Sequence, residues 1–235
     1  MINQNSLYEK RRDYFLKSNS SLKGFLGLGL VVGVASFGAG MASGELTRTW
    51  GAFLLNLMLF FSIALGGIAF GNMQDLIGAL WGRPIKRIHE AFGAFIPVAV
   101  ICFFVFFIAL KFDLLGARGV YSWVADRHVL DHFPGKNHWL TLDGMLVRGT
   151  LSLLVILGFC LWHYHLTLKP DLALIRGNKE EAFRLGAQSK EKLRHWSAPV
   201  LVVYSLAFSV LAFDLTMSLA PTWFSTLWAG WSFAI

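Results

Sequence analysis

Residues 197–220 read SAPVLVVYSLAFSVLAFDLTMSLA, an apolar run that contains one charged residue, Asp214. A helix of about 20 residues crosses the hydrocarbon core of a membrane, so this run predicts a transmembrane helix. An ionisable side chain at membrane depth costs at least about 2.5–3.5 kcal/mol, and such residues are by default functional. Asp214 is therefore the first candidate site residue, on the outer half of the helix.

The whole chain has the composition of a membrane protein. Of its 235 residues, 55% are hydrophobic and only 15% are charged, whereas a soluble domain carries about 25% charged residues. We predict an all-α, polytopic membrane protein, a helical bundle with five full transmembrane spans and a short sixth. The expected spans are residues 23–43, 50–81, 88–112, 145–168 and 197–220, and residues 221–235 begin the further span.

The charges between the spans predict the orientation. The tail of residues 1–22, the loop 82–90 and the loop 169–196 are net basic, whereas the loop 113–144 is net acidic. By the positive-inside rule the N-terminus and the loop 169–196 are cytoplasmic, and the loop 113–144 is periplasmic. The net charge of +7 is thus explained by topology, and we expect lipid rather than nucleic acid as its partner.

Small residues at helical spacing predict close helix packing in the first two spans. In the first span they are Gly29, Gly33, Ser36, Gly40 and Gly44. In the second span they are Gly67, Gly71, Gly78 and Gly82. The Phe-rich run of residues 103–107 is interpreted as a lipid-facing surface.

Further protonatable residues lie towards the predicted cytoplasmic ends of the spans. They are Asp75 in the second span, His89 and Glu90 at the start of the third, and His163 and His165 at the end of the fourth. Proton relays in membrane proteins use Asp, Glu and His residues inside helix bundles, so these five residues and Asp214 form our candidate proton pathway. The alternative is that they are solvated or paired with Lys and Arg.

Other chemistries have weaker signals. Arg148 starts the fourth span, where it pairs with a carboxylate, docks a partner or reaches to the interface. The histidines of the loop 113–144 have irregular spacing that does not favour a metal site. These are His128, His132 and His138. The span histidines gather at one boundary, which does not favour haem, and Cys102 and Cys160 are expected as buried thiols. We predict no catalytic, cofactor-binding or metal-binding residue in this chain.

A family resemblance is strongest at the C-terminal end. The run Ala198–Asp214, with Met217–Leu219 and Trp223–Thr226 after it, resembles the NrfD/PsrC-like family of integral membrane proteins, in particular the ActF subunits of bacterial alternative complex III. Weaker matches are residues 50–67, Arg87–Ala91, Ala94–Ala99 and Arg148. The resemblance covers roughly residues 45–235.

This resemblance implies a subunit of a quinol:electron-acceptor oxidoreductase in the bacterial cytoplasmic membrane. Implied partners are a paralogous NrfD-like membrane subunit, a multihaem cytochrome c and an iron–sulfur subunit. Quinol, haem c and iron–sulfur clusters would belong to those other subunits. The implied role of this chain is a non-catalytic, coupling role in proton translocation, in which Asp214 and Glu90 match family motif positions.

Three alternatives stay open from the sequence. The chain is a structural anchor whose loop 113–144 docks periplasmic haem and iron–sulfur subunits, or it binds quinol itself beside Asp214, or it is an unrelated secondary transporter. The family fold also has more spans than residues 1–235 supply. Either a second chain completes the helix bundle, or the sequence is one part of a longer chain.

Overall fold

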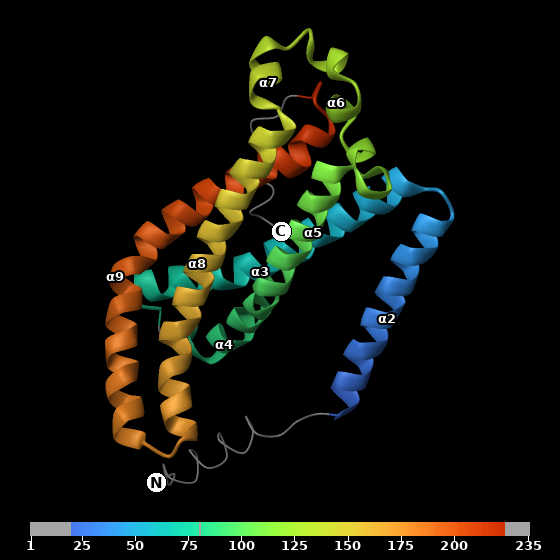
Figure 1. The fold of residues 1–235 in the computed structure, drawn as a ribbon. Helices are drawn as coiled ribbons and strands as arrows, with labels where there is room; N and C mark the ends of the chain where they lie inside the picture. The colour runs from blue at the N-terminus through green and yellow to red at the C-terminus, as the bar shows by residue number, and fades with distance from the viewer. Residues whose placement is uncertain (1–19, 80, 224–235) are drawn as a thin grey trace.

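Five long apolar helices dominate the computed structural model, which describes residues 20–79 and 81–223 (Figure 1). Within these residues the chain forms helices and turns, with no strand. The main helices are α2 (Ser20–Ala42), α3 (Leu46–Ile77), the shorter α4 (Arg83–Phe92), α5 (Ile96–Phe112), α8 (Leu142–Ile175) and α9 (Lys179–Leu211). The short elements are η1 (Gly93–Phe95), η2 (Leu114–Val120), α6 (Ser122–Ala125), η3 (Arg127–Leu130), α7 (Pro134–Trp139), the π-helical η4 (Ala212–Thr216) and η5 (Met217–Leu219).

The length and apolarity of these helices support a multi-pass membrane protein. Five segments are long and apolar enough to cross a bilayer: Lys23–Ala42, Leu46–Ile77, Ile85–Phe112, Leu142–Ile175 and Lys179–Leu219. The third of them joins α4, η1 and α5, with Pro97 near the start of α5. Most of the predicted basic tail, and most of the predicted further span at 221–235, lie outside the described residues.

The helices extend beyond the apolar runs that predict them. The segment expected as the loop 169–196 is almost entirely helical, because α8 continues to Ile175 and α9 begins at Lys179. Asn178 caps α9 by accepting a hydrogen bond from the backbone N–H of Glu181, and Gly177 adopts a positive φ of 84° in the turn. Hydropathy detects only the part of a helix that suits lipid, so the polar turns on either side of this connection were missed.

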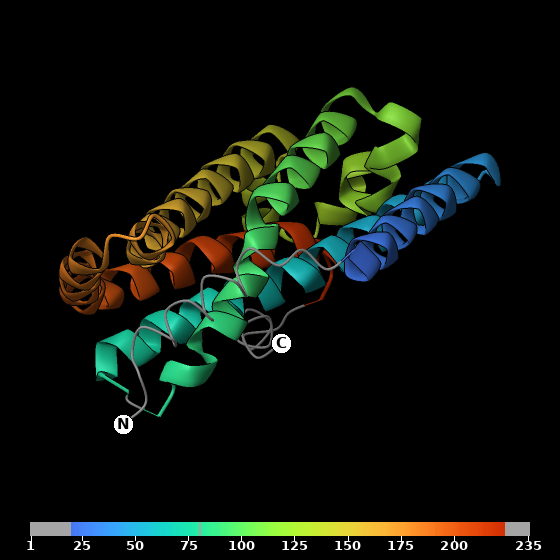
Figure 2. The ribbon, with the colours of Figure 1, turned by 90° about the horizontal axis from the view of Figure 1, so that it is seen from below.

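The helices define two ends of the molecule. The cap end carries residues 113–141, which fold into η2, α6, η3 and α7 at the top of Figure 1. The basic end carries α4 and the turn between α8 and α9. Helices α8 and α9 form an antiparallel pair, α3 packs against α9, and α5 lies between α3 and α8. Figure 2 shows α2 at the opposite side of the bundle from α8 and α9.

An aromatic core fills the half of the bundle near the cap end. The prediction that residues 103–107 face lipid is wrong, because Phe103 and Phe106 are fully buried and Phe107 nearly so. The ring of Phe103 lies 5.1 Å from that of Phe61, in an edge-to-face arrangement. Residues three and four positions apart share one face of a helix, so this run presents aromatic rings to the bundle, while Val105 stays exposed.

Small residues allow α4 to approach α3 closely. A Cβ atom at Gly67 would lie 2.2 Å from the carbonyl oxygen of His89, and one at Gly71 would lie 3.2 Å from Oε1 of Glu90. The stripe in α2 behaves differently, since Gly29 and Gly33 have no neighbouring atom within 4 Å among the described residues. The packing predicted for the second span is therefore present around Gly67 and Gly71, and in α2 it is limited to the contact of Gly40 with Thr49.

Candidate functional site

A buried carboxylate–imidazole pair lies at the basic end. Helix α4 is short and amphipathic, and it directs Glu90 into the bundle, where only 3% of the residue is exposed. Nε2 of His163, on α8, lies 2.9 Å from Oε1 of Glu90. The hydroxyl of Tyr164 donates to the backbone carbonyl of Glu90 at 2.5 Å. These two contacts join α4 to α8 within the membrane-spanning part of the bundle.

Basic residues of α4 extend this pair into a charge network. Nζ of Lys86 lies 2.6 Å from both carboxylate oxygens of Asp75 and 3.6 Å from Oε1 of Glu90. Arg87 approaches Oε2 of Glu90 at 3.5 Å and forms a closer ion pair of 2.9 Å with Asp171. Both cations therefore approach the Glu90 carboxylate only loosely, because each is held more tightly by another carboxylate, and His163 remains its closest partner.

A polar cavity of about 430 Å³ adjoins the network. It lies between α3, α4, α8 and α9, and its lining includes Asp75, Lys86, Glu90, Ser189 and Gln74. The amide of Gln74 is buried, and neither its oxygen nor its nitrogen has a hydrogen-bond partner among the described residues. A buried amide without protein partners needs water, and a cavity of this size and polarity has room for several molecules. Water can therefore reach the Glu90 carboxylate from this side.

The two ring nitrogens of His163 differ in their surroundings. Its Nδ1 atom has no hydrogen-bond partner among the described residues, and the ring is fully buried. A neutral ring with its proton on Nε2 donates to Glu90 and leaves only a lone pair unmatched. An imidazolium would leave a buried N–H group unmatched instead. The ring nitrogen without a partner, Nδ1, is therefore not the one that faces the Glu90 carboxylate.

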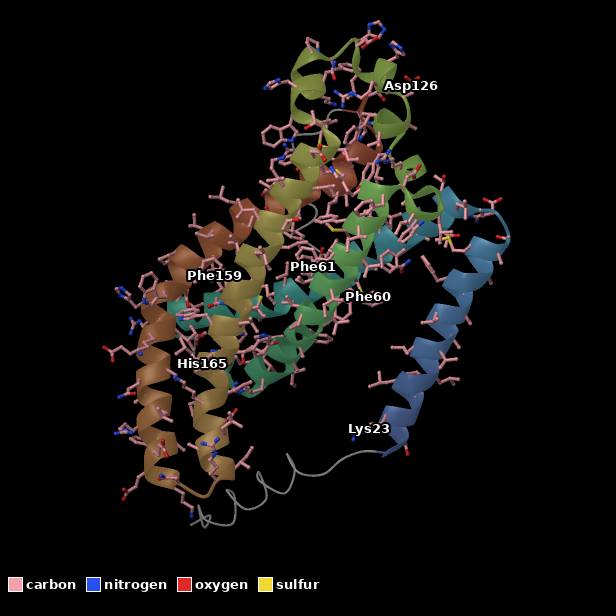
Figure 3. All side chains as sticks on the ribbon, in the orientation of Figure 1. Lys23, Phe60, Phe61, Asp126, Phe159 and His165 are labelled. Carbon is pink, nitrogen blue, oxygen red and sulfur yellow. The ribbon has the colours of Figure 1, made fainter. Side chains whose placement is uncertain are left out.

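The other predicted histidines lie around this pair without joining it. Nδ1 of His89 donates to the carbonyl of Gly67 at 3.0 Å, and the ring packs edge-on against Phe70. Its Nε2 atom is buried and lacks a partner among the described residues. His165 is exposed on α8 (Figure 3) and, two positions after His163, it points away from that residue's face.

Asp214 lies at the cap end, in a different setting. The residue is completely buried, and its carboxylate accepts hydrogen bonds from Nε of Arg148 at 2.8 Å, Nη2 of Arg148 at 3.1 Å and Nε1 of Trp139 at 2.9 Å. The guanidinium of Arg148 also lies over the Trp139 ring, 4.1 Å from its centroid. A bidentate arginine–carboxylate pair is among the strongest polar contacts in proteins. Asp214 therefore fastens α9 to the start of α8.

The cap also binds the last turns of the described chain. Tyr121 donates to the carbonyl of Leu215 at 3.0 Å, and Nε1 of Trp123 donates to that of Ser218 at 3.1 Å. Nζ of Lys136 contacts the carbonyl oxygens of Pro221 and Trp223. Burial, and then the nearby Asp214 carboxylate, raise the pKa of the Tyr121 hydroxyl, which therefore stays protonated as a donor. The cap thus satisfies carbonyl groups that the end of a helix leaves open.

The structure brings together some of the predicted residues. Glu90 and His163 are in contact, Asp75 joins them through Lys86, and His89 is next to Glu90. Asp214 is at the other end of the bundle, and its place in a proton pathway stays a prediction. Within residues 20–79 and 81–223, no group of three or more His, Cys, Asp or Glu side chains is placed to hold a metal ion.

Several members of these networks were missed from the sequence. The basic charge of residues 82–90 indicates topology, but Lys86 and Arg87 also lie four and three positions before Glu90 and so share its helix face. Trp139 had no signal, because its partner Asp214 is 75 positions away, and nothing in the sequence shows that the Gln74 amide is buried beside the cavity. Arg148 was assigned three roles, and pairing with a carboxylate is the one present.

Comparisons with known proteins add no identification. No protein-family model matches the chain, and a search of curated proteins finds no relative.

Proposed function

We propose that this chain is an integral membrane subunit of a quinol:electron-acceptor oxidoreductase of the alternative complex III type, and that it contributes to proton movement coupled to quinol oxidation. The sequence resemblance supports the complex, and the buried Glu90–His163 pair supports the proton-handling role. Histidine changes charge near neutral pH, and a carboxylate in hydrogen-bond contact can exchange a proton with it. This pair is the observation on which the function rests.

In this proposal the basic end faces the cytoplasm of a bacterial cell, with the N-terminus on the same side and the cap in the periplasm. The support is the excess of Lys and Arg in the tail and in the residues around α4 and the α8–α9 turn. The partners are a paralogous NrfD-like membrane subunit, a multihaem cytochrome c and an iron–sulfur subunit. Those chains hold the quinol, haem c and iron–sulfur clusters.

The proton enters through the polar cavity. Water in the cavity delivers it to the carboxylate of Glu90, whose negative charge is then neutralised, so that its attraction to Lys86 and Arg87 weakens. His163 supplies the second proton-binding group, since a proton bound at its unmatched Nδ1 allows Nε2 to release its own proton to an ionised Glu90 carboxylate. Neutralising Glu90 leaves Lys86 paired with Asp75 and Arg87 paired with Asp171, so no cation becomes unpaired during the step.

The test uses the assembled complex in liposomes, with Glu90→Gln against the exposed-site control Glu191→Gln on α9. Both substitutions replace one carboxylate by an amide of the same shape. We expect Glu90→Gln to lower the number of protons translocated per electron while quinol oxidation continues in the presence of an uncoupler. Glu191→Gln should match the wild type. An unchanged proton-to-electron ratio in an assembled Glu90→Gln complex would refute the proton-handling role.

A second function, a structural anchor for periplasmic subunits, is favoured by the cap. Residues 121–139 are bound to the segment that follows α9 by the contacts of Tyr121, Trp123 and Lys136 and by the hydrogen bond from Trp139 to Asp214. A loop fixed in this way presents one surface to partners. If this is the main role, then Arg148→Ala should detach the redox subunits during purification while Glu90→Gln has no effect on coupling.

A further inference from the structure

Helix α2 leaves a groove beside the bundle. Near the cap end α2 contacts α3, where the Phe37 ring lies 5.3 Å from Trp50 and 5.6 Å from Phe53. Towards the basic end the two helices separate, as Figure 1 shows, and a Cβ atom at Gly29 or Gly33 would meet no atom of another described element within 4 Å. Two apolar helices that diverge inside a membrane enclose a space that must be filled, because hydrocarbon leaves no gap of molecular size unoccupied.

The groove has an apolar body and a polar mouth. Its volume is about 630 Å³, and its walls come from α2, α3, η1 and α5. The apolar walls are formed by Phe37, Phe53, Phe60 and Phe95, and Phe60 is labelled in Figure 3 on the side of the bundle towards α2. The mouth lies at the turn between α2 and α3 and contains Ser43, Glu45 and Arg48. This shape suits an amphiphile whose head lies at the cap end and whose tail runs along the aromatic rings.

The mouth carries one charge of each sign. Glu45 and Arg48 are exposed, and neither side chain forms a hydrogen bond or ion pair with another described residue. The neighbouring hydroxyls are already used, since Ser43 donates to the carbonyl of Gly40 and Thr49 to that of Glu45. Glu45 and Arg48 thus place one negative and one positive charge at the edge of the apolar region. These charges complement a headgroup that has both a phosphate and an ammonium group.

We propose that this groove binds a phospholipid with a zwitterionic, primary-amine headgroup, of the phosphatidylethanolamine type. The phosphate lies at Arg48, the ammonium group lies at Glu45, and one acyl chain occupies the aromatic groove as far as Gly33. The site is independent of the proton-handling role at Glu90. The bound lipid completes the contact between α2 and the bundle that protein atoms leave open.

Other occupants fit less well. A helix about 10 Å wide with a rise of 1.5 Å per residue occupies about 120 Å³ per residue, so the groove would take only about five residues of a helix that needs about 20 to cross the membrane. An anionic lipid such as phosphatidylglycerol offers a phosphate to Arg48 but only neutral hydroxyl groups, and no cation, to Glu45. A choline headgroup carries a positive charge but has no N–H to donate to the Glu45 carboxylate.

The experiment measures which lipid stays with the purified complex. The complex is equilibrated with vesicles of equal parts dioleoyl phosphatidylethanolamine, phosphatidylglycerol and phosphatidylcholine, purified again, and examined by native mass spectrometry. We expect phosphatidylethanolamine to be enriched over the vesicle composition. Arg48→Ala and Glu45→Gln should each reduce that enrichment by about fivefold, as expected for loss of one partly exposed ion pair. Arg184→Ala, at an exposed site on α9, serves as the control and should leave it unchanged.

A third variant tests the apolar part of the site. Ala52→Phe places a ring in the groove without changing a charge, and it should also reduce the retained phosphatidylethanolamine. Retained lipid that follows the vesicle composition in the wild type would refute the proposal, as would Arg48→Ala and Glu45→Gln complexes with unchanged enrichment. A map of the complex with a protein segment in the groove would likewise overturn it and assign the site to a partner chain.

Discussion

Glu90 and Asp214 are both carboxylates buried in a membrane-spanning bundle, and they differ in how completely they are paired. Asp214 accepts three hydrogen bonds from Arg148 and Trp139. Glu90 has one good contact, with His163, and two longer approaches to cations that pair elsewhere. A polar cavity reaches Glu90, and it includes the unpartnered Gln74 amide. Asp214, whose carboxylate is fully paired, suits a role in holding helices together. Glu90, whose carboxylate is only partly paired, suits an exchange of protons.

The largest loss of stability should come from removing Arg148, the partner of the fully paired Asp214. Arg148→Ala leaves the Asp214 charge buried and unpaired, which should destabilise the fold by about 3–5 kcal/mol. Thermal unfolding of the purified complex in detergent measures the loss. The corresponding change at the other end, Arg87→Ala, should have a much smaller effect, because Glu90 keeps His163 and Lys86. Equal losses in the two variants would remove the distinction between the carboxylates.

A second substitution would separate α4 from α3 without touching a charge. A Cβ atom at Gly67 meets the carbonyl oxygen of His89 at 2.2 Å, so Gly67→Ala should displace α4 and destabilise the fold by about 1–3 kcal/mol. The neighbouring Gly66 provides the control, since a Cβ there has no neighbour within 4 Å. Gly66→Ala should leave the apparent Tm equal to or slightly above that of the wild type. A Gly67→Ala variant with the Tm of the wild type would contradict the close approach of α4 to α3.

The two histidines on α8 allow a matched pair of substitutions at the basic end, one at the buried His163 and one at the exposed His165. His163→Ala removes the one strong hydrogen bond of Glu90 and should destabilise the fold by about 1–3 kcal/mol. It should also lower the proton-to-electron ratio of the complex in liposomes. His165→Ala, two positions away and exposed, should change neither quantity. Similar ratios for the two variants would show that the Glu90–His163 contact is structural only.

The smallest effect concerns pH at the cap. Nδ1 of His128 lies 2.9 Å from a carboxylate oxygen of Asp131. This hydrogen bond, and to a smaller extent the negative charges of Asp131 and Asp126, raise the pKa of His128 above its ordinary value of about 6.5. The contact should therefore stabilise the cap fully below about pH 6.5 and lose this effect as the pH rises through the raised pKa. Asp131→Asn should bring the His128 titration, followed by NMR of the ring protons, back down towards 6.5. An unchanged titration would show that Asp131 does not control it.

The sequence predicted what hydropathy and residue type can encode. The five apolar helices follow from long apolar runs, and Asp214 is an isolated charged residue within one of them. The burial of Glu90 and His163, which lie at the ends of their spans, was left open by the sequence, since such residues are also found solvated. The interpretation of residues 103–107 failed because hydropathy does not distinguish lipid from protein as surroundings. The pairing of Asp214 with Trp139 joins residues 75 positions apart, and no local pattern reports such a contact. The polar turns of α8 and α9 were missed because they are helical without being apolar.

Because residues Ala212–Thr216 form a π-helical turn, the contact of Asp214 with Arg148 and Trp139 depends on the number of residues in that turn as well as on the side chains. A π-helical turn contains one more residue than the α-helical turn it replaces, and each residue of an α-helix turns by about 100° around its axis. Deletion of the exposed Phe213 would let α9 continue as a regular α-helix, with the following segment rotated relative to the cap. Every side chain except Phe213 would be retained, yet Tyr121 and Trp123 would no longer face the carbonyls of Leu215 and Ser218. In related chains, a one-residue gap at this position would therefore separate proteins with a fastened cap from those with a free one.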